Sequence, residues 1–186
     1  MAELQFPDPA LACELVALRP WRQADLASMV ALFSDPLVQR FSWARSDEYT
    51  RADGAAYLAG QEQARQAGSE LHFAFVAPDD ANVLLGGGSL YDVDTQEQRA
   101  ATGYWLGPDA RGRGIATAAL RLMAQWAFDD LGLQRIELTC GPDNLASQAV
   151  ARRCGFVSEG VLRSHMNHKG NRRDTVLYSL LPTELT

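Results

Sequence analysis

The chain has 186 residues, 47% of them hydrophobic and 22% charged, and its formal net charge is −6. That length suits one domain with a buried core, so we expect a single domain over residues 1–186 with its core at about 14–181. The composition excludes a disordered chain. The acidic balance argues against non-specific nucleic-acid binding, which needs a broad positive field.

The three cysteines are Cys13, Cys140 and Cys154. An odd number without CxxC spacing argues against a disulfide framework or a zinc site, so we expect no metal. Free thiols are typical of a reducing cytoplasm. The chain start lacks the basic and apolar segments of a signal peptide, and the longest strongly apolar run, residues 71–78, is too short to cross a bilayer. We therefore expect a cytoplasmic protein without a membrane partner.

Apolar spacing predicts helices at residues 25–33, 48–66, 115–131 and 144–153. Alternating or branched segments predict strands at residues 14–19, 71–77, 83–91, 98–106, 135–140, 156–163 and 175–181. Asp35-Pro36 predicts the end of the first helix, residues 39–46 a loop, and the surroundings of Lys169-Gly170-Asn171 a polar loop. A meander followed by one strand–helix–strand crossover predicts a mixed sheet in an α/β (α+β mixed) domain.

The segment at residues 106–117 carries the most chemical information. A strand ends there, and Gly112 and Gly114 let the backbone turn with positive φ and approach a ligand closely. The first N–H groups of the following helix have no partner inside it and point outward at the positive end of the helix dipole. This arrangement suits a pyrophosphate, and Arg111 and Arg113 add positive charge.

Other interpretations of this segment stay open or fall away. It can be a glycine-rich turn with two solvated arginines. A P-loop is excluded, because no Lys-Ser/Thr pair follows. A dinucleotide fingerprint fails at Thr117, and Glu137 lies mid-strand, where its side chain would not reach a ribose. A nicotinamide-dinucleotide oxidoreductase is therefore the less favoured alternative.

Several segments in chain order resemble one family. Arg111-x-x-Gly114-x-Ala116 resembles the acyl-CoA signature of the GNAT acetyltransferase superfamily. Asn144-x-x-Ser147 followed by Cys154-Gly155-Phe156 is similar to its next motif. Residues 103–106 and the tail from Glu159 to Tyr178 are similar to the RimJ/RimL branch of ribosomal-protein N-alpha-acetyltransferases.

This resemblance implies a single GNAT-like domain, whose central mixed, mostly antiparallel sheet of about seven strands is flanked by helices. It also implies transfer of an acetyl group from acetyl-CoA to a primary amine, by direct attack in a ternary complex. A non-catalytic acyl-CoA-binding module is the alternative. The expected partners are acetyl-CoA and an amine acceptor, with a homodimer possible because relatives often pair.

The resemblance assigns residues to the cofactor. The backbones of Trp105, Leu106 and Gly107 would bind the pantetheine amides, in a strand that separates from its neighbour. The pyrophosphate would be held by the segment Arg111, Gly112, Arg113, Gly114, Ile115, Ala116 and Thr117. Asn144 would contact the cofactor arm, and Arg152 the 3′-phosphate. Packing for Trp105, helix capping for Asn144 and a dipole contact for Arg152 stay open.

The resemblance also assigns the catalytic chemistry, to Ser147 with Asn144. In this branch the serine lies near the thioester sulfur and can protonate the leaving thiolate. Many other members use a tyrosine four residues further on, where this chain has Ala151. An acyl-cysteine intermediate is not expected, because no histidine lies near Cys140 or Cys154 in the sequence.

No strong base is visible by motif. The strand at residues 100–106 has no carboxylate, and Met166 occupies the position where some RimL-like members have a glutamate. His165, Glu159, Asp92 or a water relay are the candidates. An α-amine (pKa ~7.8) is far easier to deprotonate than a lysine (pKa ~10.4), so an acceptor amine of low pKa is favoured.

The acceptor side is expected at residues 39–46 and 92–98, by analogy with the family. Phe41, Trp43 and Tyr91 are the candidates for contact with the acceptor, and the first two can equally be packing residues. The acidic remainder of the chain suits a basic acceptor.

Overall fold

The computed structural model describes residues 3–42 and 48–186. Seven strands form one sheet in the order β1-β2-β3-β4-β5-β7-β6. Their bounds are β1 Ala17–Pro20, β2 Leu71–Val76, β3 Leu84–Asp94, β4 Arg99–Leu106, β5 Arg135–Cys140, β6 Val157–His168 and β7 Asn171–Leu180. Within the described residues, β4 and β5 run parallel and the other neighbours run antiparallel. The expected mixed, mostly antiparallel sheet is confirmed.

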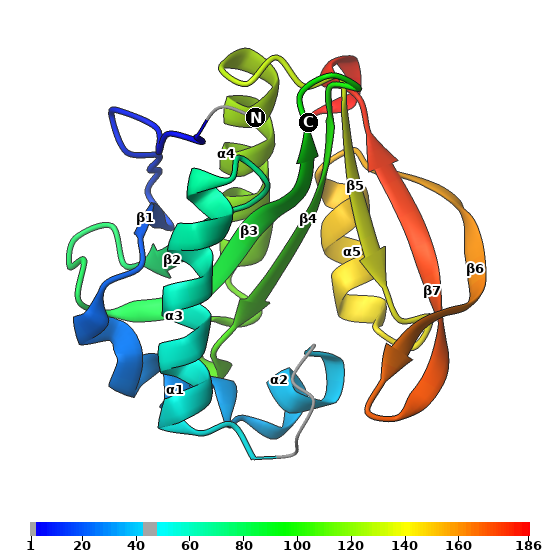
Figure 1. Cartoon of the computed structure of the whole chain (residues 1–186). Coiled ribbons are helices and arrows are strands. Elements are labelled where there is room, and N and C mark those ends of the chain that lie inside the picture. The colour runs from blue at the N-terminus through cyan, green and yellow to red at the C-terminus, as the bar shows by residue number, and fades with distance from the viewer. Residues whose placement is uncertain (1–2, 43–47) are drawn as a thin grey trace.

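Helices cover both faces of this sheet (Figure 1). They are α1 Leu26–Phe33, α2 Pro36–Phe41, α3 Arg51–Gln66, α4 Ile115–Asp129 and α5 Leu145–Arg153. On the α3 face, Tyr57 packs edge-on against His72 of β2. On the opposite face, the Met123 side chain of α4 lies beside Gly88 of β3.

The main core lies between the sheet and α4. Phe73 and Phe75 of β2 are fully buried, and so is Met123 of α4. The Phe73 ring meets Trp126 edge to face, with 6.1 Å between centroids. The apolar stripe of α4 faces the sheet because its apolar residues recur three and four positions apart.

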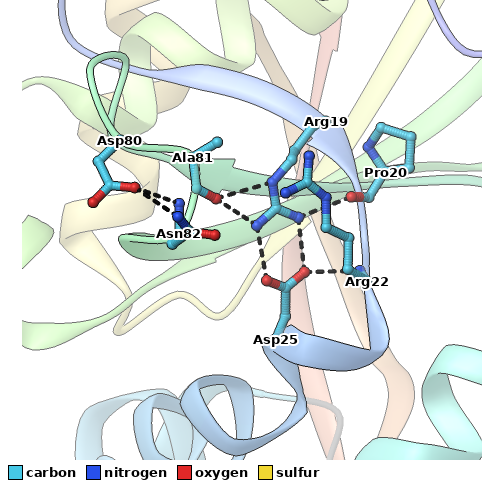
Figure 2. Close-up of polar contacts among 7 residues, drawn as sticks. All are labelled: Arg19, Pro20, Arg22, Asp25, Asp80, Ala81 and Asn82. Carbon is cyan, nitrogen blue, oxygen red and sulfur yellow. Dashed lines mark hydrogen bonds and ion pairs between the residues drawn. The ribbon is translucent and has the colours of Figure 1, made fainter.

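A buried ion pair ties the start of the sheet together (Figure 2). Arg19 of β1 donates two hydrogen bonds, of 2.7 and 2.8 Å, to the Asp25 carboxylate just before α1. The same guanidinium donates to the carbonyl of Ala81 in the β2–β3 connection. The β2–β3 connection is thereby joined to β1 and to the residues before α1, which lie about 60 residues earlier in the sequence.

Two sequence expectations were wrong at their boundaries. The first helix ends before Asp35-Pro36 as expected, but residues 36–41 form helix α2, so residues 39–41 are not in the expected loop. Asp35 accepts hydrogen bonds from Leu37 N and Val38 N and so begins this helix. The last two strands continue as a hairpin to His168 and Asn171, so the expected polar loop shrinks to a tight turn.

Among the described residues, no helix is long and apolar enough to cross a membrane. Cys13 is exposed, Cys140 and Cys154 are buried, and all three are free thiols.

Candidate functional site

The parallel ladder between β4 and β5 opens partway along the strands. Pairing runs from Arg99 with Arg135 to Thr102 with Leu138, whereas β4 continues to Leu106. Beyond Thr102 the two strands diverge, and α5 lies near the opening (Figure 1). The separation expected from the family resemblance is therefore present.

A cavity of about 1120 Å³ passes through this opening. The predicted site residues that line it are Phe41, Tyr91, Trp105, Leu106, Arg111, Gly112, Gly114, Ile115, Ala116, Thr117, Asn144 and Ser147. Gly107, Arg113 and Arg152 do not line it. Trp43 lies outside the described residues.

One end of the cavity is the N-terminus of α4. Gly112 and Gly114 have φ of 71° and 81°, a region that L side chains rarely adopt. The N–H groups of the first turn of α4 have no acceptor inside the helix and point into this space. Their partial positive charge makes this end suitable for a phosphate.

The two arginines of the signature are less free than the sequence suggests. Arg111 donates to the carbonyl of Leu106 at 3.1 and 3.2 Å and pairs with Asp35. Its hydrogen bond holds the pKa of Asp35 below the usual value. Arg113 is exposed and donates to the carbonyl of Asp109. Arg111 thus braces the loop against α2, and the backbone supplies most of the anion site.

The structure places Arg152 outside the cavity lining. Its guanidinium donates to Gln148 and to the Tyr178 hydroxyl and lies over the Tyr178 ring. Arg153 lines the cavity and donates to Thr117 Oγ1 at 3.3 Å. Arg153 therefore adds a cation beside the N-terminus of α4, and adjacent arginines on a helix cannot be told apart by motif.

The direction of the β4 backbone also corrects two assignments. Gly107 N donates to Leu85 O of the segment beside β4, at 2.9 Å. Because antiparallel pairs alternate, Trp105 likewise turns its N–H and C=O toward β3, and Tyr104 and Leu106 turn theirs toward the opening. The Trp105 and Gly107 backbones are thus occupied, and Tyr104 was missed.

The Trp105 ring is a packing group. It stacks on Trp21 with 6.1 Å between ring centroids, and Phe33 of α1 meets it edge to face. It forms part of the cavity wall beneath α1.

At the mouth of α5, Asn144 and Ser147 are held in one turn. Asn144 is the helix N-cap, and its Oδ1 accepts from Ser147 N at 3.1 Å. The Tyr104 hydroxyl donates to Ser147 Oγ at 3.2 Å. Ser147 Oγ also hydrogen-bonds to the Cys140 thiol, and Ser147 lines the cavity.

The thiols and the tyrosine at this place have suppressed ionisation. Burial raises the pKa of Tyr104 to about 12 and that of Cys154 to about 11. Burial also raises the pKa of Cys140, and it outweighs the hydrogen bond from Ser147, which lowers that pKa. Tyr104 stays protonated at neutral pH as a donor, and neither cysteine supplies a thiolate nucleophile.

The three candidate bases lie outside the cavity lining. Glu159 accepts from Arg135 and Ser179, and its hydrogen bond with Arg135 lowers its pKa to about 2. His165 is bonded to Thr175.

The acceptor end of the cavity holds other polar groups. The Tyr91 side chain of β3 extends across β4 and forms a hydrogen bond with Thr139 of β5. Its ring lies beside Gly103 of β4, 3.6 Å from the position that a Cβ atom would take there. Glu70 and His72 of the β2 segment line the cavity as well. Sequence reasoning missed them because Glu70 directly precedes an apolar run and His72 lies within it. In the part of the chain that the structure describes, no group of His, Cys, Asp or Glu could hold a metal ion.

A strand opening beside a helix N-terminus that suits phosphates, with a serine–tyrosine pair in the gap, defines an acyl-CoA-dependent N-acyltransferase. The acetyltransferase (GNAT) domain family matches residues 16–157 of this chain. The chain belongs to this family, and the expectation of an N-acetyltransferase is confirmed.

Among curated proteins, YdaF of Bacillus subtilis is 39% identical over 101 residues, which cover 54% of this chain and 55%, about half, of that protein. YjcK of Bacillus subtilis, named as a probable N-acetyltransferase, is 33% identical over 89% of this chain and 93% of its own. The ribosomal-protein-serine acetyltransferase of Escherichia coli is 30% identical over 68% of this chain and 69% of its own.

Solved structures share the fold. Mycobacterium smegmatis RimJ, in complex with CoA-disulfide, has a TM-score of 0.80 and 27% identity over 91% of this chain and 83% of that chain. A RimL structure in complex with coenzyme A has a TM-score of 0.81 at 22% identity, covering 92% of this chain and 97% of that chain, and supports the fold alone.

Proposed function

We propose that this acetyltransferase acetylates an N-terminal α-amine or a small primary amine of low pKa, by direct attack in a ternary complex. The single observation that carries the proposal is the cavity, which runs through the opened β4–β5 ladder from the N-terminus of α4 to the α3 face of the sheet. A cytoplasmic location and a homodimer stay predictions of the sequence.

The residues present suit acetyl-CoA as substrate. The first turn of α4 offers unpaired N–H groups for the pyrophosphate, and Arg153 offers a cation for the 3′-phosphate. The outward backbone groups of Tyr104 and Leu106 can pair with pantetheine amides as a strand would.

The chemical step then follows from the groups at the opening. The neutral amine forms a C–N bond to the thioester carbonyl as the C–S bond breaks. Ser147 gives its Oγ proton to the departing thiolate and takes one from the Tyr104 hydroxyl, and the proton that the amide nitrogen loses restores the pair. General acid catalysis of this kind contributes about 10²–10⁴-fold.

The choice of acceptor rests on proton energetics. Strand β4 contains no aspartate or glutamate, so it adds no carboxylate to the cavity lining. An α-amine with pKa ~7.8 is already partly neutral at physiological pH, and a lysine with pKa ~10.4 is not. The Escherichia coli relative is named for a ribosomal-protein serine, which agrees with an N-terminal acceptor.

A thiol-release assay with matched peptides tests the acceptor. One peptide has a free N-terminal serine and no lysine, and the other has an acetylated N-terminus and one internal lysine. We expect turnover of the first and little of the second at pH 7.5. Faster turnover of the lysine peptide would contradict the α-amine assignment, and no turnover with tight CoA binding would favour a binding module.

Substitution of Ser147 tests the acid. We expect Ser147→Ala to lower kcat about 10²-fold or more with little change in CoA affinity, and Tyr104→Phe to lower it less. The control is Ser158→Ala, an exposed serine on β6. An unchanged rate in Ser147→Ala would remove this serine from the chemistry.

A further inference from the structure

The acceptor end of the cavity holds a carboxylate that the acetyl-transfer chemistry does not use. Glu70 lies directly before β2 and lines the cavity, with 38% of its side chain exposed. Its Oε2 accepts from His72 Nε2 at 2.6 Å. His72 Nδ1 lies 2.9 Å from the hydroxyl of Tyr57 on α3.

These three groups form a positioning chain. An ionised carboxylate only accepts, so His72 donates to it from Nε2, and Nδ1 meets the Tyr57 hydroxyl. Tyr57 is half-buried, and burial raises the pKa of its hydroxyl, which therefore stays protonated at neutral pH. His72 and Tyr57 thus fix the Glu70 carboxylate in one orientation at the cavity wall.

The Glu70 carboxylate is held in its charged form. The hydrogen bond from His72, which outweighs partial burial, keeps the pKa of Glu70 below its usual value. The other titratable groups around it are Tyr91 of β3, whose pKa Glu70 helps to raise, and Tyr49 and Asp53 near the start of α3. Apart from His72, which pairs with Glu70, none of these groups brings a positive charge to the carboxylate.

The cations that line the cavity lie elsewhere and have partners. Arg173 pairs with Asp143, which also pairs with Arg40, and both guanidinium groups lie over the Phe41 ring. Arg111 and Arg153 belong to the end at α4. The Glu70 end therefore offers a carboxylate between aromatic walls, away from every arginine that lines the cavity, and this favours a cationic ligand.

Sheet register separates this carboxylate from the reacting centre. His72 pairs with Ser89, and Ser89 pairs with Gly103 of β4, so the three residues form one row on one face. Two strand spacings, ~10 Å, lie between the β2 row and β4. A group bound at Glu70 is therefore distinct from the amine that attacks the thioester beside β4.

We propose that Glu70, positioned by His72 and Tyr57, binds a second positive charge on the acceptor. The acceptor class is then a primary amine that carries a cationic group several bonds away, from either a small diamine or a basic residue near a peptide N-terminus. This inference rests on the proposed function, because it concerns the acceptor of the same site. The proton of the attacking amine is not assigned to Glu70.

Matched acceptor pairs test the inference without any variant. The small-molecule pair is 1,4-diaminobutane and n-butylamine, and the peptide pair is Ser-Ala-Lys-Ala and Ser-Ala-norleucine-Ala, both as C-terminal amides. We expect the cationic member of at least one pair to have about 10- to 100-fold higher kcat/KM, the size of a charge-assisted hydrogen bond. The pair that shows the preference tells whether the second positive charge belongs to a small diamine or to a basic residue near a peptide N-terminus. Equal kcat/KM within both pairs would overturn the inference.

Variants then locate the preference. Glu70→Gln should abolish it and leave the KM for acetyl-CoA unchanged. His72→Gln should weaken it. The control is Glu14→Gln, which removes the same charge from an exposed position outside the cavity and should keep the preference. A preference that survives Glu70→Gln would overturn the inference. Absence of turnover with every amine, with CoA still bound, would instead overturn the proposed function on which the inference rests.

Discussion

Removal of the Asp25 carboxylate should destabilise the fold by about 3–4 kcal/mol. The Arg19 and Asp25 side chains are only 8% and 7% exposed, so Asp25→Ala leaves a buried guanidinium without its anion (Figure 2). Breaking such a pair costs ~3–5 kcal/mol. Arg19 keeps the carbonyls of Pro20 and Ala81, which places the loss near ~3 kcal/mol. The Arg22 N–H also loses its 2.7 Å acceptor, which adds ~1 kcal/mol.

Urea denaturation measures the free energy of unfolding of the wild type, of Asp25→Ala, of the single variants Arg19→Leu and Asp25→Leu, and of the double variant Arg19→Leu/Asp25→Leu. The double variant should lose much less stability than either single variant, because a buried pair replaced by apolar groups is often close to neutral. A loss below about 1 kcal/mol for Asp25→Ala would refute the reasoning, since it would mean that Arg19 needs no counter-charge. So would a double variant whose loss equals the sum of the two single losses.

The same pair should set part of the acid limb of stability. Burial raises the pKa of Asp25, but the hydrogen bonds and charges of Arg19 and Arg22 outweigh it and leave the pKa below the usual 3.8. A carboxyl whose pKa is lower in the folded state stabilises the fold above its unfolded pKa. That contribution is lost as pH falls below 3.8 through the folded value. Asp25→Asn should flatten the pH dependence in this window, and an unchanged slope would contradict it.

Two further predictions concern the cofactor end. Gly114→Asp should weaken CoA binding more than tenfold and Gly114→Asn only slightly: both side chains tolerate positive φ, the added Cβ meets Leu15 at an ordinary 3.5 Å, and the two variants differ in charge. Calorimetry that finds equal affinities would move the pyrophosphate elsewhere. Arg153→Gln should lower affinity for CoA about tenfold but not for dephospho-CoA, whereas Arg152→Gln should affect neither. Equal loss for both ligands in Arg153→Gln would exclude a 3′-phosphate contact.

Local sequence signals located the helices and strands, but the dipeptide Asp35-Pro36 was interpreted only as a helix end. Asp35-Pro36 indicated a helix end, and it does follow α1. The same dipeptide is also a helix start, with Asp as N-cap and Pro at the first position. Which signal prevails depends on what the next residues pack against. Leu37 and Val38 line the cavity, and that tertiary fact is absent from the local pattern.

The candidate site was predictable where it depends on backbone and not where it depends on register. Gly112 and Gly114 predicted the turn before α4, because glycine is the residue that most readily adopts the positive φ found there. Tyr104 and Glu70 gave no such signal. Their roles depend on which face of the sheet each residue occupies and which strand lies beside it. The pairing of β2 with β3 and the opening between β4 and β5 are visible only in the folded structure.

Alternation along β4 explains how one strand serves both partners of the reaction. Tyr104 points its side chain to the face of α5, where it meets Ser147. Gly103, one residue earlier, faces the opposite side, in the row of Ser89 and His72. An acetyl thioester held against the β4 backbone would therefore have the proton donor for its sulfur on one face and the acceptor floor on the other. The Tyr91 ring lies against Gly103 on that face, so an amine that attacks from there would pass beside Tyr91, and attack and departure would occur on opposite sides of the sheet.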